Sequence, residues 1–76
     1  MRQVINNLLY DTQKASVVYK EQDKSKTLWQ MNNTKTFFFV FADGHIEPIT
    51  KEAAKEYLGL IDVQVYIQMF GEPQEG

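Results

Sequence analysis

The strongest hydrophobic pattern in the chain is the segment Thr36–Ala42, which reads T-F-F-F-V-F-A. It carries no charge and no helical spacing of apolar residues, and its aromatic and β-branched side chains suit a pleated strand. Side chains alternate between the two faces of a strand. The two faces here consist of Phe37, Phe39 and Phe41 on one side and Phe38, Val40 and Ala42 on the other. Neither face is polar, so both need cover, and we expect this strand to lie centrally in a sheet.

Shorter apolar runs precede this strand. Residues 3–5 and 8–10 flank Asn6-Asn7, and asparagine tolerates the positive φ of a tight hairpin turn. Asp11 or Thr12 then has the side-chain oxygen to cap a short helical turn over residues 13–15. Residues 16–21 alternate weakly, which predicts a strand. A helix over residues 12–19 is the alternative, because three apolar residues in this range also share a helical face.

The clearest hairpin signal joins the segment Thr27–Met31 to the phenylalanine strand through the short polar turn 32–35, which begins Asn32-Asn33. Asp43-Gly44 then supplies turn chemistry that ends the strand. The next extended piece, residues 46–49, contains Pro48, which lacks a backbone N–H and restricts the residue before it. We therefore expect this piece at an edge of the sheet or in a loop.

Two helices are predicted after Thr50, which is a good N-cap. The first ends at Gly59, a residue type common just after a helix. The second is capped by Asp62 and ended by Gly71. A strand over residues 63–69 is the alternative to the second helix, because apolar residues also alternate with glutamines there.

These elements predict an α+β fold: an antiparallel meander of three or four strands, followed by two helices packed on one face of the sheet. Residues 1–71 are expected to form a single domain, and residues 72–76 a frayed tail. We expect Phe37, Phe39 and Phe41 to face the helices, where Tyr57, Leu58, Ile67 and Phe70 supply the opposing apolar surface.

Composition narrows the function classes. The 76 residues include no cysteine and one histidine, so no disulfide, metal site or cofactor is expected. The net charge of −2 argues against a general nucleic-acid binder, whose affinity depends on excess Lys and Arg. No apolar run approaches the ~20 residues of a membrane span, and the first residues lack the apolar core of a signal peptide. We expect a cytoplasmic protein with no membrane partner.

Candidate catalytic groups are sparse. His45 lies between Asp43 and Glu47 at a turn, where a surface role is the common one. Glu52 and Glu56 are spaced as neighbours on a helix, but no second pair or set of histidines completes a metal site. The sequence therefore predicts no enzyme and no small-molecule substrate.

The segment Leu9–Ala15 resembles the Y-D-T-x-x-A opening of small uncharacterised proteins from Gram-positive bacteria and their mobile elements. The resemblance continues at residues 26–28, in the aromatic strand, at residues 48–56 and at residues 66–72. One departure is Asn32-Asn33, where such proteins often have a glycine. The grouping carries no assigned activity, so no site residue is implied. The resemblance suggests a phage or plasmid setting, in which small proteins often block host machinery such as defence nucleases.

Three function classes follow. The favoured one is a non-enzymatic protein-binding module, an inhibitor or modulator of a host protein in the manner of anti-CRISPR proteins. Its expected partner-binding surface, for a host protein or a second copy of the chain, is the second apolar face of the sheet. This face is formed by Phe38 and Val40, with Trp29 or Leu28 added by the neighbouring strand, depending on register. The alternative at that face is that residues 4–9 fold across it and close it within one chain. An enzyme is the least favoured class.

The remaining function class is a regulator that binds single-stranded nucleic acid. Aromatic rings on strands can stack bases, and nearby lysines can hold phosphates. The residues for this reading are Trp29, Phe37, Phe39 and Phe41 for stacking, with Lys20, Lys24, Lys26 and Lys35 for the backbone. Buried phenylalanines are much commoner than exposed ones, so nucleic acid ranks below a protein partner.

Overall fold

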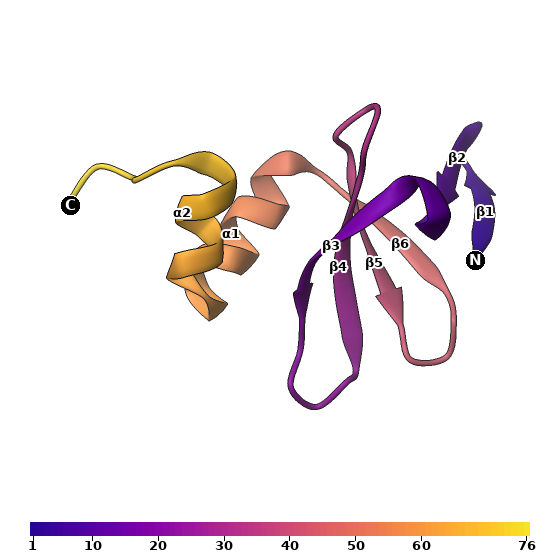
Figure 1. Ribbon diagram of the computed structural model, residues 1–76, viewed down its shortest axis with the longest axis horizontal. Helices are drawn as coiled ribbons and strands as arrows, with labels where there is room; N and C mark the ends of the chain where they lie inside the picture. The colour runs from indigo at the N-terminus through magenta and orange to yellow at the C-terminus, as the bar shows by residue number, and fades with distance from the viewer.

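The computed structural model describes all 76 residues. It contains six strands, one 3₁₀ turn and two helices (Figure 1). In chain order these are β1 (Arg2–Ile5), β2 (Leu8–Asp11), η1 (Thr12–Lys14), β3 (Ala15–Lys20), β4 (Lys26–Met31), β5 (Phe37–Phe41), β6 (Ile46–Ile49), α1 (Lys51–Ile61) and α2 (Val63–Phe70). The α+β class is confirmed, as is the position of both helices at the C-terminal end.

The four strands β3 to β6 form an antiparallel meander in chain order, and β1 and β2 form a separate hairpin. The phenylalanine strand β5 lies inside the sheet between β4 and β6, as its two apolar faces predicted. Its register places Phe38 beside Trp29 and Phe39 beside Leu28. Pro48 lies on β6, an edge strand, which is consistent with its missing N–H.

The two helices cover one face of the sheet and the N-terminal hairpin lies on the other side (Figure 1). The core on the helix side consists of Leu28, Phe37, Phe39, Ala54 and Leu58, with Tyr57 and Phe70 packed against it. The ring centroids of Phe39 and Tyr57 are 5.0 Å apart, and those of Phe37 and Phe70 are 5.9 Å apart. The expected contact between the odd-numbered phenylalanines and the helices is confirmed for Tyr57, Leu58 and Phe70. The prediction for Ile67 is wrong, because α2 packs on this core through Val65, Tyr66, Met69 and Phe70 instead.

A second core lies on the hairpin side and consists of Tyr10, Met31, Phe38 and Ile46. The ring of Tyr10 packs edge-on against Phe38, with centroids 5.4 Å apart. The N-terminal hairpin thus closes this face within one chain, which is the alternative that the sequence left open. The expectation of an open apolar face around Phe38 is wrong, because one strand pair suffices to cover it.

Turn and cap chemistry explains most of the element boundaries. Asn6 and Asn7 have φ values of 53° and 66°, as a two-residue hairpin turn of type I′ requires. Residues 12–20 form η1 and a strand rather than a helix. In the β4–β5 turn, Lys35 takes the positive φ of 63° and the two asparagines do not.

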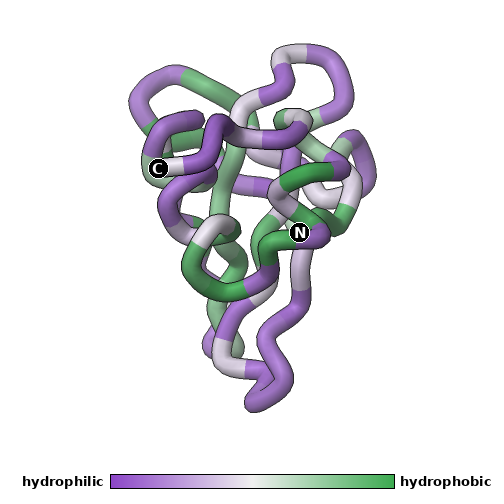
Figure 2. The backbone as a smooth tube through the Cα atoms, turned by 90° about the vertical axis from the view of Figure 1, so that its left-hand side faces the viewer, coloured by the Kyte–Doolittle hydropathy of each residue, from purple (hydrophilic) through white to green (hydrophobic).

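The protruding β3–β4 turn is hydrophilic and extends lowest in Figure 2.

The helix boundaries bring one correction. Thr50 caps α1, with its hydroxyl accepting from the Ala53 N–H at 3.0 Å. The helix does not end at Gly59 but continues to Ile61. Asp62 then closes α1 through its N–H and opens α2 through its carboxylate, which accepts from Gln64 N–H at 3.1 Å. Neither helix has the length and the apolar run needed to cross a bilayer.

Candidate protein-binding surface

The four residues expected to bind a partner do not form an open surface. Phe38 and Leu28 are 0% exposed, and they lie on opposite faces of the sheet, in the hairpin-side and helix-side cores. Trp29 and Val40 are half-buried against the hairpin-side core. Trp29 stacks on Phe38, with centroids 6.4 Å apart and the planes 14° from parallel. A partner that touched Phe38 or Leu28 would first have to displace the hairpin or the helices.

The helices also cover phenylalanine rings that would stack nucleic-acid bases in the alternative function class predicted from the sequence. Phe37 and Phe39 are buried beneath the helices. Lys26 lies against the rings, with its Nζ 4.5 Å from the centroid of Phe39. Base stacking needs an exposed ring face, so these phenylalanines are not presented for it.

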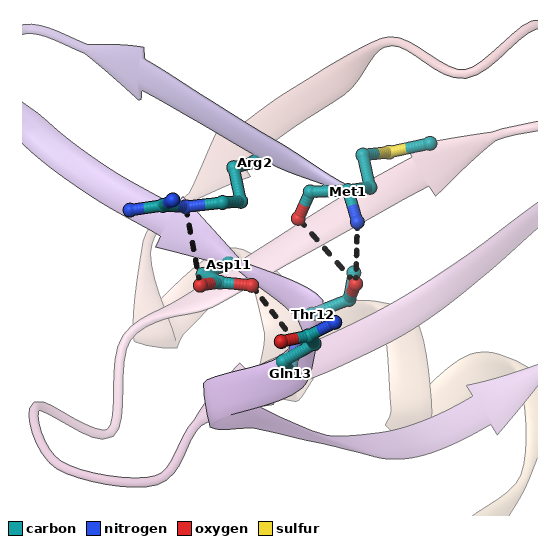
Figure 3. A network of polar contacts seen from close by, with 5 residues as sticks. All are labelled: Met1, Arg2, Asp11, Thr12 and Gln13. Carbon is teal, nitrogen blue, oxygen red and sulfur yellow. Dashed lines mark hydrogen bonds and ion pairs between the residues drawn. The ribbon is translucent and has the colours of Figure 1, made fainter.

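Asp11 and Thr12 lie where the chain passes from the hairpin to the sheet (Figure 3). Asp11 is 3% exposed, and its carboxylate accepts from the Gln13 N–H at 3.0 Å and pairs with Arg2 Nε at 3.4 Å. Thr12 Oγ1 accepts from the Met1 amine at 3.2 Å. The expected role of Asp11 as a cap is confirmed, and these contacts join the two ends of the hairpin to the turn that follows it.

His45 belongs to the β5–β6 turn. Its ring stacks on Phe41 with centroids 4.3 Å apart, and its Nδ1 lies 2.6 Å from Asp43 Oδ1. Both side chains are more than half exposed. The His45 N–H and ring hold the pKa of the Asp43 carboxyl below its usual range. No group of three or more His, Asp and Glu side chains is placed to hold a metal ion.

The most exposed large apolar side chain of the molecule is Leu60, at 91%. It lies where α1 ends and α2 begins, next to Ile61 at 42% and close to Val63 at 53%. Because Asp62 caps both helices, the chain turns sharply there, and these three side chains are left outside the helix–sheet interface. We call this region, with the two pockets beside it, the elbow surface.

Two shallow pockets flank the elbow. The larger, about 580 Å³, is lined by Ala53, Glu56, Tyr57, Gly59 and Leu60. The smaller, about 310 Å³, is lined by Tyr19, Glu21, Gln22, Asp23 and Ile61. A hydrogen bond joins their walls, because the Tyr57 hydroxyl donates to Glu21 Oε2 at 2.5 Å. The elbow surface therefore combines aliphatic side chains, a hydrogen-bonded partition and carboxylates.

Tyr57 ties α1 to the start of the β3–β4 turn. Burial raises the pKa of its phenol above the ordinary value, and the hydrogen bond from the phenol to Glu21 raises the pKa further. Its ring also packs against Tyr19 and Phe39, with centroids 6.2 and 5.0 Å away. The phenol thus stays a donor well into the alkaline range and keeps Glu21 in place.

We expect Tyr57→Phe to lose less free energy of unfolding than wild type when the pH is raised from neutral to alkaline. An unfolded tyrosine ionises near pH 10, whereas the folded phenol stays protonated, so its contribution is full below about pH 10 and falls as the pH rises further. Urea unfolding at neutral and alkaline pH measures this. Wild type should lose more free energy of unfolding than the variant, and equal losses would show that the bond to Glu21 does not persist.

The elbow surface was not found from the sequence. The predicted end of the first helix at Gly59 places Leu60 outside a helix, and Ile61 precedes the predicted cap Asp62. The available signal was the L-I-D-V run at residues 60–63, where aliphatic residues flank a cap at the point where the helix axis changes. The exposure of the aliphatic side chains in this run depends on the angle between the two helices, which the sequence pattern does not specify.

In comparisons with known proteins, no protein-family model, no curated protein and no solved structure matches the chain.

Proposed function

We propose that this chain is a small, non-enzymatic protein-binding module, and that it contacts its partner through the elbow surface. The observation that carries the proposal is Leu60, an aliphatic side chain left 91% exposed on a folded helix beside a pocket of about 580 Å³. A single exposed leucine is ordinary, but contiguous apolar exposure at a pocket is typical of interaction sites. Here Ile61 and Val63 extend the apolar exposure on either side of Asp62.

The proposed role is to modulate a host protein. The resemblance to small mobile-element proteins suggests a target such as a defence nuclease. The exposed side chains of Leu60, Ile61 and Val63 form an aliphatic ridge on the elbow surface, and this ridge would contact the target. Rigid, preformed surfaces bind with less loss of conformational entropy than flexible ones. The ridge is fixed by two caps and by the Tyr57–Glu21 hydrogen bond.

The test compares proteins captured from nuclease-treated host lysate by wild type, by Leu60→Ser and by the matched control Val4→Ser. Val4 is 70% exposed on the hairpin, so its replacement removes a similar aliphatic group far from the elbow. We expect a protein that wild type and Val4→Ser both retain and that Leu60→Ser loses. The same set of captured proteins for all three would refute the role of the elbow surface.

A further inference from the structure

The elbow surface carries three carboxylates that form no ion pair. Glu21, Asp23 and Glu56 line its two pockets, and no Lys, Arg or His lines either one. The ion pairs of the molecule are Arg2–Asp11 and His45–Asp43, so none of the three elbow carboxylates has a cation within pairing distance. Lys20 and Lys24 line a neighbouring pocket that also includes Glu21, and the Nζ of Lys26 lies 5.3 Å from the centroid of the Tyr57 ring.

Two of these carboxylates are held in position. Glu21 accepts from Ser25 Oγ at 3.2 Å through one oxygen and from the Tyr57 hydroxyl through the other. Asp23 Oδ1 accepts from the Ser25 N–H at 2.9 Å. This bond lowers the pKa of Asp23, so the group is ionised at neutral pH. Their positions are therefore set before any partner arrives, which reduces the entropy lost on binding.

A surface with an aliphatic ridge and unpaired carboxylates favours a partner with the opposite charge around matching apolar groups. Phosphate-rich ligands, whether nucleic acid or anionic lipid, meet repulsion from the same carboxylates. Resting on the proposed function, we infer that the partner contacts the elbow surface through a cationic amphipathic segment. Its aliphatic side chains cover Leu60 and Ile61, and its Lys or Arg side chains face Glu56 on one flank and Glu21 and Asp23 on the other.

The probe is a synthetic amphipathic helix of leucine and lysine, with a counterpart in which glutamate replaces lysine. Binding is measured by titration against wild type, Leu60→Ser, and the double variant Asp23→Asn/Glu56→Gln. The charge-matched control is Glu72→Gln/Glu75→Gln, which removes two carboxylates from the exposed C-terminal residues. Surface ion pairs contribute about 0.2–1 kcal/mol each, so the elbow double variant should bind about twofold to thirtyfold more weakly.

We expect the lysine helix to bind, the glutamate helix not to bind, and the affinity to fall as salt rises. Leu60→Ser should weaken binding, and the control pair should leave it unchanged. Equal affinity for both helices, or equal losses in the two double variants, would overturn the inference. If the lysate partner depends on Leu60 but not on Asp23 and Glu56, the proposed function stands and the cationic partner is refuted. If nothing depends on Leu60, the proposed function itself fails.

Discussion

Phe39→Ala is expected to reduce the free energy of unfolding by about 3–5 kcal/mol, the usual cost of removing a buried phenylalanine. Phe39 is 7% exposed, in the core beneath the helices. Its ring contacts Tyr57 edge-on with a centroid distance of 5.0 Å, and its loss leaves a cavity that two short helices cannot close. Small domains have total stabilities near the low end of 5–15 kcal/mol, so a large fraction of the variant should be unfolded at 37 °C.

Urea unfolding measures this effect, and Leu60→Ala is the matched control. Leu60→Ala also truncates an apolar side chain, but one that is 91% exposed, and surface substitutions usually stay within about 0.5 kcal/mol. A midpoint for Phe39→Ala close to that of the control would show that Phe39 does not lie in the core. A stable Leu60 variant also means that any binding defect at that position is not a folding defect.

Strand and helix positions were predictable because local chemistry determines them. Alternation in β5, the asparagine pair at residues 6–7 and the caps Thr50 and Asp62 each act over a few residues, and each is found where expected. Glycine at position 59 gave a false signal. Glycine is common just after a helix, but Gly59 does not adopt a positive φ, and the Asp62 cap determines where α1 ends.

The cover of the second sheet face was harder to predict, because it depends on long-range packing. Residues 4–9 are apolar, and the sequence allows them either to fold across the sheet or to leave it open. The Asp11 contacts are local, because Arg2 is its partner within the hairpin and Gln13 belongs to the next turn. The contact that closes the face is the packing of Tyr10 against Phe38. With that face closed, Leu60 at the elbow is the most exposed large apolar side chain, and Val4 and Leu8 are exposed on the hairpin.

The second large effect is expected for Phe38→Ser. Phe38 is 0% exposed between the sheet and the hairpin, in contact with Tyr10 and Trp29. Removing its ring should cost at least the ~3–5 kcal/mol of a buried phenylalanine. The serine hydroxyl adds a cost of about 1–3 kcal/mol if it stays without a partner. The variant should therefore be largely unfolded, whereas an open partner-binding face would have tolerated the change.

Phe38→Leu keeps this prediction measurable if the serine variant does not fold. Leucine retains an apolar side chain, so the protein should fold with a smaller loss of stability. The fluorescence of Trp29, the single tryptophan, should change because its stacked neighbour is gone. Val4→Ser, on the exposed side of the hairpin, should alter neither the stability by more than about 0.5 kcal/mol nor the tryptophan signal. A Phe38→Ser protein as stable as Val4→Ser would mean that the hairpin does not cover Phe38 and that this face is open to a partner after all.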